Sequence, residues 1–112
     1  MGRSYGPPMP PRRRHRWTDR LGAHGRILVR WETEQVVVAF AVILLAEVDG
    51  AWRTVVLFDC THGDRNDRHR YSYDGVKGPA VTFHHGTPGE AMNDAIRLIR
   101  ADYERMIERW HP

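Results

Sequence analysis

The stretch that decides the fold is VVVAFAVILLAEV, residues 36–48, which is apolar almost throughout and rich in β-branched side chains. Such a run fits either a fully buried strand or a buried helix, because periodicity alone does not separate the two. Directly after it comes Asp49-Gly50, the preferred two-residue turn of a β-hairpin. We therefore expect residues 36–48 to form a strand that turns back into a second one.

The segment after this turn supports the hairpin. Alternation over residues 52–60 puts Trp52, Thr54, Val56, Phe58 and Cys60 on one face and Arg53, Val55, Leu57 and Asp59 on the other. Further strand candidates are residues 27–31, 69–73 and 80–85, with a polar loop over 61–68. A register that sets Phe58 opposite Tyr71 also sets Asp59 opposite Arg70, which would form a cross-strand ion pair.

The C-terminal segment predicts a helix over about residues 88–110. Thr87 suits the N-cap, Pro88 the first helical position, and Glu90 completes a capping box. Apolar residues then recur on one helical face, at positions 92, 95, 96, 99, 103, 106, 107 and 110. This is the clearest pattern in the chain.

Together these elements predict an α+β domain, an antiparallel meander of four or five strands packed against one long C-terminal helix. The 112 residues suffice for a single domain, which we place at residues 17–112. One helix covers one face of a sheet, yet a strand as apolar as residues 36–46 favours cover on both. The N-terminal segment or a second copy of the chain would supply that cover, so a homodimer is expected.

The basic charge of the chain lies at its N-terminus. Residues 1–26 hold seven arginines against one acid, a net +6, whereas residues 27–112 hold ten Lys and Arg against thirteen Asp and Glu, a net −3. Residues 1–16 also contain four prolines, which disfavour helix and strand. We expect a flexible arm whose Arg12, Arg13 and Arg14 pair with nucleic-acid phosphates or with an acidic protein. General enrichment in arginine would explain the same pattern.

The chain carries no sign of export or of membrane insertion. Its single cysteine, Cys60, allows no internal disulfide. The longest apolar run, residues 36–46, is far shorter than the ~20 residues of a membrane-spanning helix, and no apolar segment follows the N-terminal arginines as in a signal peptide. A cytoplasmic location without a membrane partner is expected.

Reactive side chains concentrate between residues 59 and 70. His62 and His69 could act as base and acid on a ribose 2′-hydroxyl and its leaving oxygen, since imidazole titrates near neutrality. Arg68 or Arg70 could then hold the phosphate. This chemistry predicts metal-independent RNA cleavage and needs no cofactor.

Three other interpretations of this stretch remain open. The residue types would suit a metal ion, although their order matches no standard binding loop; the five candidates are Asp59, His62, Asp64, Asp67 and His69. Cys60 could serve as a nucleophile beside His62. The stretch could instead be a solvated turn whose Asp and Asn side chains bond local backbone groups.

The run Val55-Val56-Leu57-Phe58-Asp59, followed by His62-Gly63-Asp64 and His69, resembles the central motif of the TumE-like family, the toxin half of bacterial toxin–antitoxin pairs. The resemblance covers about residues 36–110 and departs from the family at Cys60, where an Asn is expected. It also extends to uncharacterised small domains of actinobacteria and their phages. It implies a toxin acting on RNA or translation, neutralised by an antitoxin protein, and adds Asp59 to His62 and His69 as candidate catalytic residues.

The sequence thus leaves two functional hypotheses. The first is a TumE-like toxin, an endoribonuclease with His62 and His69 as its acid and base. The second is a non-catalytic domain whose arm or exposed sheet face binds a protein or a nucleic acid.

Overall fold

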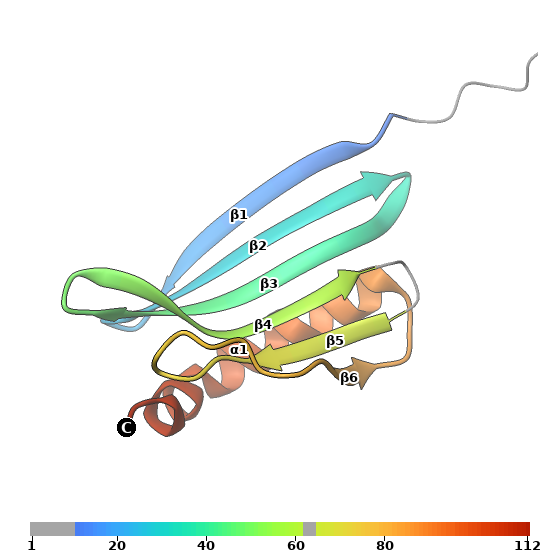
Figure 1. The fold of residues 1–112 in the computed structure, drawn as a ribbon. Helices are drawn as coiled ribbons and strands as arrows, with labels where there is room; N and C mark the ends of the chain where they lie inside the picture. The colour runs from blue at the N-terminus through green and yellow to red at the C-terminus, as the bar shows by residue number, and fades with distance from the viewer. Residues whose placement is uncertain (1–10, 62–64) are drawn as a thin grey trace, which may run out of the picture.

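The computed structural model describes residues 11–61 and 65–112, which form one antiparallel sheet and one helix (Figure 1). Within the described residues the sheet has six strands, one more than the upper limit expected, and they follow each other in chain order. The strands are β1 (Arg13–Leu21), β2 (Gly25–Glu34), β3 (Val36–Val48), β4 (Ala51–Thr61), β5 (Arg65–Arg70) and β6 (Val81–His84), and the helix is α1 (Pro88–Trp110). The α+β class and the antiparallel meander are confirmed.

The unexpected strand is β1. It begins at Arg13, within the segment for which proline content indicates a flexible arm, and pairs along its whole length with β2. It extends the sheet at its edge and does not fold over the second face, so the cover expected from the N-terminal segment is not provided by the described residues.

The β3–β4 hairpin forms where the sequence places it. Asp49 has a φ of 52° and Gly50 a φ of 80°, the two left-handed conformations of a type I′ turn. This turn matches the right-handed twist of the flanking strands, so a short connection suffices between two strands of 13 and 11 residues.

The expected alternation along β4 is wrong in its first half, because the strand contains a β-bulge. Leu44 pairs with Val56, but Leu45 pairs with Thr54, which leaves Val55 without an opposite residue. Trp52 and Thr54 therefore face away from the side occupied by Val56. Val55 and Val56 are both buried as a result.

The expected register of β5 is also wrong. Residues 65–70 are a strand rather than a polar loop, and Asp59 stands opposite Asp67, not Arg70. Phe58 pairs with Arg68 instead of Tyr71. The polar strand is held in place by its neighbours: the Asn66 side-chain amide donates to the carbonyl oxygens of His84 and Gly86, 3.1 and 2.9 Å away.

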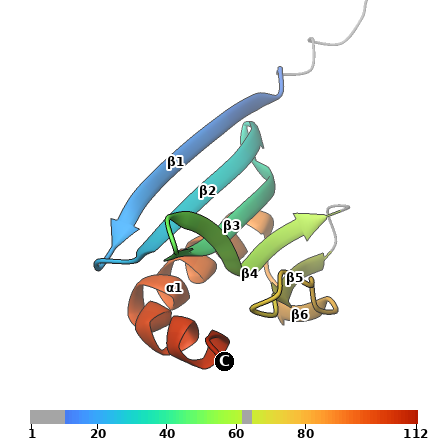
Figure 2. The ribbon, with the colours of Figure 1, turned by 60° about the vertical axis from the view of Figure 1, so that its left-hand side comes forward.

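The core lies between α1 and one face of the sheet (Figure 2). α1 packs chiefly against β3 and β4, and its small residues Ala91 and Ala95 let it approach closely. Fully buried side chains from the sheet and the helix meet there; the largest are Phe58, Ile27, Leu44, Ile99, Val29 and Val42. At ~25 cal/mol per Å² of apolar surface removed from water, this layer is the main source of stability.

The limits of α1 agree with the sequence prediction. The Thr87 hydroxyl accepts from the Glu90 amide at 3.2 Å, and the Glu90 carboxylate accepts from the Thr87 amide at 3.1 Å. This capping box satisfies two backbone donors that an α-helix leaves unpaired at its N-terminus. In the described part of the chain no helix has the length and apolar character needed to cross a membrane.

Candidate functional site

The sheet face opposite α1, called the open face below, carries two rows of arginines. Strand alternation and the β1–β2 register place five guanidinium groups on it, from Arg14, Arg16, Arg20, Arg26 and Arg30. The acids in the same two rows, Glu32 and Glu34, lie together at the end of β2. No helix among the described residues lies over this face (Figures 1 and 2).

The arginines of the two rows stand directly opposite one another. Arg16 pairs with Arg30 and Arg20 with Arg26, although like charges at opposite positions destabilise a sheet. Glu32 lies 3.6 Å from the Arg14 guanidinium and offsets the positive charge at that end of the rows only. An anion bound over the face would relieve this repulsion.

A shallow depression of about 550 Å³ connects the arginine rows with the middle of the sheet. Arg14, Arg16 and Arg30 line one side of it and Asp59 the other. The small side chains of Ala39 and Ala41 form the floor between them. The same depression therefore joins the basic rows to the predicted catalytic carboxylate.

A second feature of the open face is a stacked pair. The Arg26 guanidinium lies 4.8 Å from the centre of the Trp52 ring. Its Nε is buried and has no hydrogen-bond partner among the described residues. A planar cation held over an indole is a surface on which a nucleobase can stack.

Two predicted catalytic residues, Asp59 and His69, meet at the border of the depression. His69 Nε2 lies 3.7 Å from an Asp59 carboxylate oxygen, and His69 Nδ1 is 3.1 Å from the carbonyl oxygen of Gly78. The Gly78 contact favours the tautomer that carries a proton on Nδ1 and directs Nε2 toward Asp59. The third predicted residue, His62, lies outside the described residues.

Asp59 is in an unusual electrostatic environment. It is 9% exposed, and the buried Asp67 stands opposite it on β5. Burial raises the pKa of Asp59 and the Asp67 charge adds to the rise, while the charges of His69 and Lys77 oppose it. A carboxyl group with a raised pKa beside an imidazole has the character of a proton-transfer pair.

The predicted phosphate ligands Arg68 and Arg70 are not near this pair. They alternate with His69 along β5 and point to the opposite side of the sheet, toward α1. The sheet therefore separates them from Asp59 and His69. On the open face, Arg14, Arg16 and Arg30 line the same depression as Asp59.

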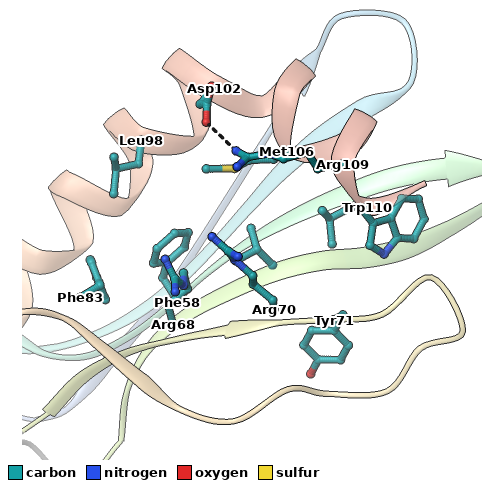
Figure 3. A pocket seen from close by; sticks show the side chains of 12 residues that line it. Phe58, Arg68, Arg70, Tyr71, Phe83, Leu98, Asp102, Met106, Arg109 and Trp110 are labelled. Carbon is teal, nitrogen blue, oxygen red and sulfur yellow. Dashed lines mark hydrogen bonds and ion pairs between the residues drawn. The ribbon is translucent and has the colours of Figure 1, made fainter. Parts of the chain in front are cut away.

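Arg68 and Arg70 instead line a cavity of about 380 Å³ between α1 and strands β4 and β5, called the helix-side cleft below (Figure 3). Arg109 of α1 faces them from the other wall, where it pairs with Asp102 at 3.4 Å. The apolar lining comes mainly from Phe58, Phe83, Leu98, Met106 and Trp110.

The other two predicted ligands have different settings. Arg12 lies at the start of the described chain, 3.2 Å from Glu34, and Arg13 is an exposed residue of β1. Both Arg12 and Arg14 are therefore partly neutralised, by Glu34 and Glu32, and 88% of the Arg14 side chain is exposed.

Three residues of these sites, Arg16, Arg30 and Arg109, are not among those expected from the sequence. For the first two, the signal is that every arginine of residues 14–30 has an even number. This places them on one face only if both segments are strands. Arg109 borders the apolar stripe of the helix but nothing in the sequence shows what it faces.

A metal site is not formed by the described side chains, since no group of three potential ligands among them is suitably arranged. Of the five residues considered for this role, His62 and Asp64 lie outside the described ranges. Cys60 is buried in the core.

Comparison with known proteins gives a family match. The model of a family described as "Domain of unknown function (DUF7718)" matches residues 9–112. No curated protein and no solved structure matches the chain. The resemblance to TumE-like toxins receives no support from these comparisons, while the resemblance to uncharacterised domains agrees with them.

Proposed function

Because this chain belongs to the family described as "Domain of unknown function (DUF7718)", we propose its function from its own geometry: the open face of the sheet binds single-stranded nucleic acid. The observation that carries the proposal is the direct opposition of arginines on β1 and β2. A planar guanidinium fork binds phosphate groups, as it does carboxylates, through two parallel hydrogen bonds.

The shape of the face supports a single strand as the ligand. A sheet with its helix on the far side offers a broad surface along which a flexible backbone can run, and the Arg26–Trp52 pair offers a base a stacking partner. Side chains at i and i+2 of a strand repeat every ~6.6 Å, so Arg14 and Arg16 can contact successive parts of one backbone.

A second copy of the chain is a less suitable occupant of this face. In a two-fold dimer the same surface meets itself, so the arginine rows of the two copies would lie close together unless the interface were displaced toward β4. Homodimerisation remains a prediction, and light scattering of the concentrated protein tests it. A stable dimer that excludes nucleic acid would contradict the proposal.

The test compares two charge-matched double variants. Fluorescence anisotropy with a labelled 12-nucleotide RNA and the same DNA sequence measures affinity for the wild type and for Arg16→Gln/Arg30→Gln. The control is Arg97→Gln/Arg105→Gln, which removes two exposed charges from α1. Loss of tenfold or more in affinity only in the open-face variant supports the proposal; equal losses in both variants would show that net charge alone is responsible.

A second candidate function is RNA cleavage, favoured by the position of His69 beside Asp59 at the border of the same depression. In this proposal the pair takes the proton from a ribose 2′-hydroxyl, the hydroxyl oxygen attacks the adjacent phosphorus to form a 2′,3′-cyclic phosphate, and the pair returns that proton to the departing 5′-oxygen of the next nucleotide. Arg14, Arg16 and Arg30 hold the phosphate. A toxin of the TumE type with an antitoxin partner would use such an activity.

Two measurements separate cleavage from binding. Labelled RNA incubated with the wild type should give shorter products, and His69→Ala should abolish them while retaining RNA affinity. Induced expression should arrest growth only with the wild type, at equal protein levels. If the RNA is bound but stays intact, the binding proposal stands and the nuclease proposal is wrong.

A further inference from the structure

The helix-side cleft has features of a second binding site, on the face of the sheet opposite the proposed nucleic-acid surface. We propose that it binds a small organic anion, an aromatic or acyl body that carries one carboxylate or phosphate group. This inference does not rest on the proposed function, because the two sites share no residue.

The strongest argument comes from two buried donors. Arg68 and Trp110 both line the cleft, and their Nε and Nε1 atoms are buried with no hydrogen-bond acceptor in the part of the chain that the structure describes. Buried N–H groups in native proteins are nearly always paired, since an unpaired one costs the energy of its lost hydration. Both groups can only donate, so an acceptor would satisfy them.

The charges around the cleft also favour a negatively charged acceptor. Among the described residues no carboxylate forms an ion pair with Arg68 or Arg70, and burial together with the Arg70 charge lowers the pKa of Arg68. The third guanidinium, Arg109, shares Asp102 with Arg105. Three cations thus border the cleft against one acid, and that acid is already paired.

The rest of the lining is apolar and indicates the body of the ligand. Phe58 and Phe83 pack edge to face with ring centres 4.8 Å apart, and Leu98 is exposed on the helix above them. Figure 3 shows Arg68 beside Phe58 and the guanidinium group of Arg70 directed toward α1. A cavity of about 380 Å³ lies within the usual range for small-molecule sites, roughly 300–1,000 Å³.

The experiment is an NMR titration of the full chain with four probes. 3-Phenylpropionate and phenyl phosphate carry the apolar body and an anion; 3-phenylpropan-1-ol lacks the charge, and inorganic phosphate lacks the body. The two anionic aromatics should shift the Trp110 indole N–H signal and the Leu98 and Met106 methyl signals in a saturable manner. The anion that binds with the higher affinity shows whether the cleft prefers a carboxylate or a phosphate group.

Two variants locate the site. Arg70 is exposed, so Arg70→Gln should leave the fold intact and weaken binding of the preferred anion about tenfold, as expected for one charge-assisted hydrogen bond. Arg30→Gln, on the open face, should leave this affinity unchanged while it weakens nucleic-acid binding.

Three results would overturn the proposal: the neutral alcohol binding as tightly as the acid, shifts that map outside the cleft, or unchanged affinity in Arg70→Gln. Failure of nucleic-acid binding with retained anion binding would contradict only the proposed function.

Discussion

Asp59 and Asp67 stand directly opposite each other on β4 and β5, and both are buried, with 9% and 5% of their surface exposed. Arg65 and the Thr82 hydroxyl contact Asp67, at 3.4 and 3.3 Å. The Asp59 Oδ1 atom is buried without a hydrogen bond from any described residue, and the His69 ring lies 3.7 Å from it. The two carboxyl groups therefore have different surroundings, as in a pair suited to proton transfer.

The surroundings of Asp59 predict an effect of pH on stability. The pKa of Asp59 is raised in the folded protein, so its contribution to the free energy of unfolding is complete below the unfolded value of 3.8 and is lost as pH rises through the folded pKa. The amide that replaces the carboxyl group in Asp59→Asn does not titrate. The variant should therefore gain stability relative to the wild type between about pH 3 and pH 6, below the usual pKa of a histidine.

Urea unfolding of both proteins across this range, followed by circular dichroism, measures the difference. The groups that face Asp59 are Asp67, His69 and Lys77, and Lys77→Gln is a useful companion because it removes a charge that opposes the rise. A stability difference that stays constant with pH, or that decreases, would show that Asp59 ionises normally in the fold.

The capping box gives a prediction for α1. Thr87→Ala removes the side-chain acceptor of the Glu90 amide and should cost about 1 kcal/mol in the free energy of unfolding. Glu90→Gln retains a side-chain acceptor for the Thr87 amide and should cost less. Chemical denaturation measures both; equal losses would mean that the charge of Glu90 stabilises this terminus as much as the Thr87 acceptor does.

Two glycines provide a matched test of backbone conformation. Gly50 has a φ of 80° with nothing near its would-be Cβ, so Gly50→Ala should destabilise by about 1 kcal/mol through the backbone alone. Gly89 lies in the first turn of α1, where a Cβ would meet Val37 at ordinary contact distance. Gly89→Ala should stabilise by roughly 0.5 kcal/mol. Thermal unfolding distinguishes them, and a Gly50→Ala variant as stable as the wild type would contradict the type I′ turn.

The elements predicted correctly are those whose sequence and environment agree. β3 is apolar and central, its turn has the residues that positive φ favours, and α1 has a complete capping box followed by a periodic apolar stripe. In each of these elements, local preference and packing favour the same structure, so the sequence alone predicts it.

The elements predicted wrongly are stabilised by their neighbours. β5 reads RNDRHR and has no apolar residue, yet it is a strand because β4 and β6 pair with it on both sides and Asn66 bonds the His84 carbonyl of β6. β1 has only Trp17 and Leu21 as apolar residues. The sequence places Arg68 in a loop, where it could approach His69; because residues 65–70 are a strand, Arg68 and Arg70 point to the face opposite His69.

The central claim, that opposed arginines of the open face hold nucleic-acid phosphates, is tested most directly by the salt dependence of binding. For single strands the slope of log K against log salt is about −0.7 for each phosphate contact. We predict that Arg16→Gln/Arg30→Gln makes the slope for a 12-nucleotide RNA shallower by roughly 1.4 than in the wild type, while Arg97→Gln/Arg105→Gln does not change it. Equal slopes in the wild type and the open-face variant would contradict the account.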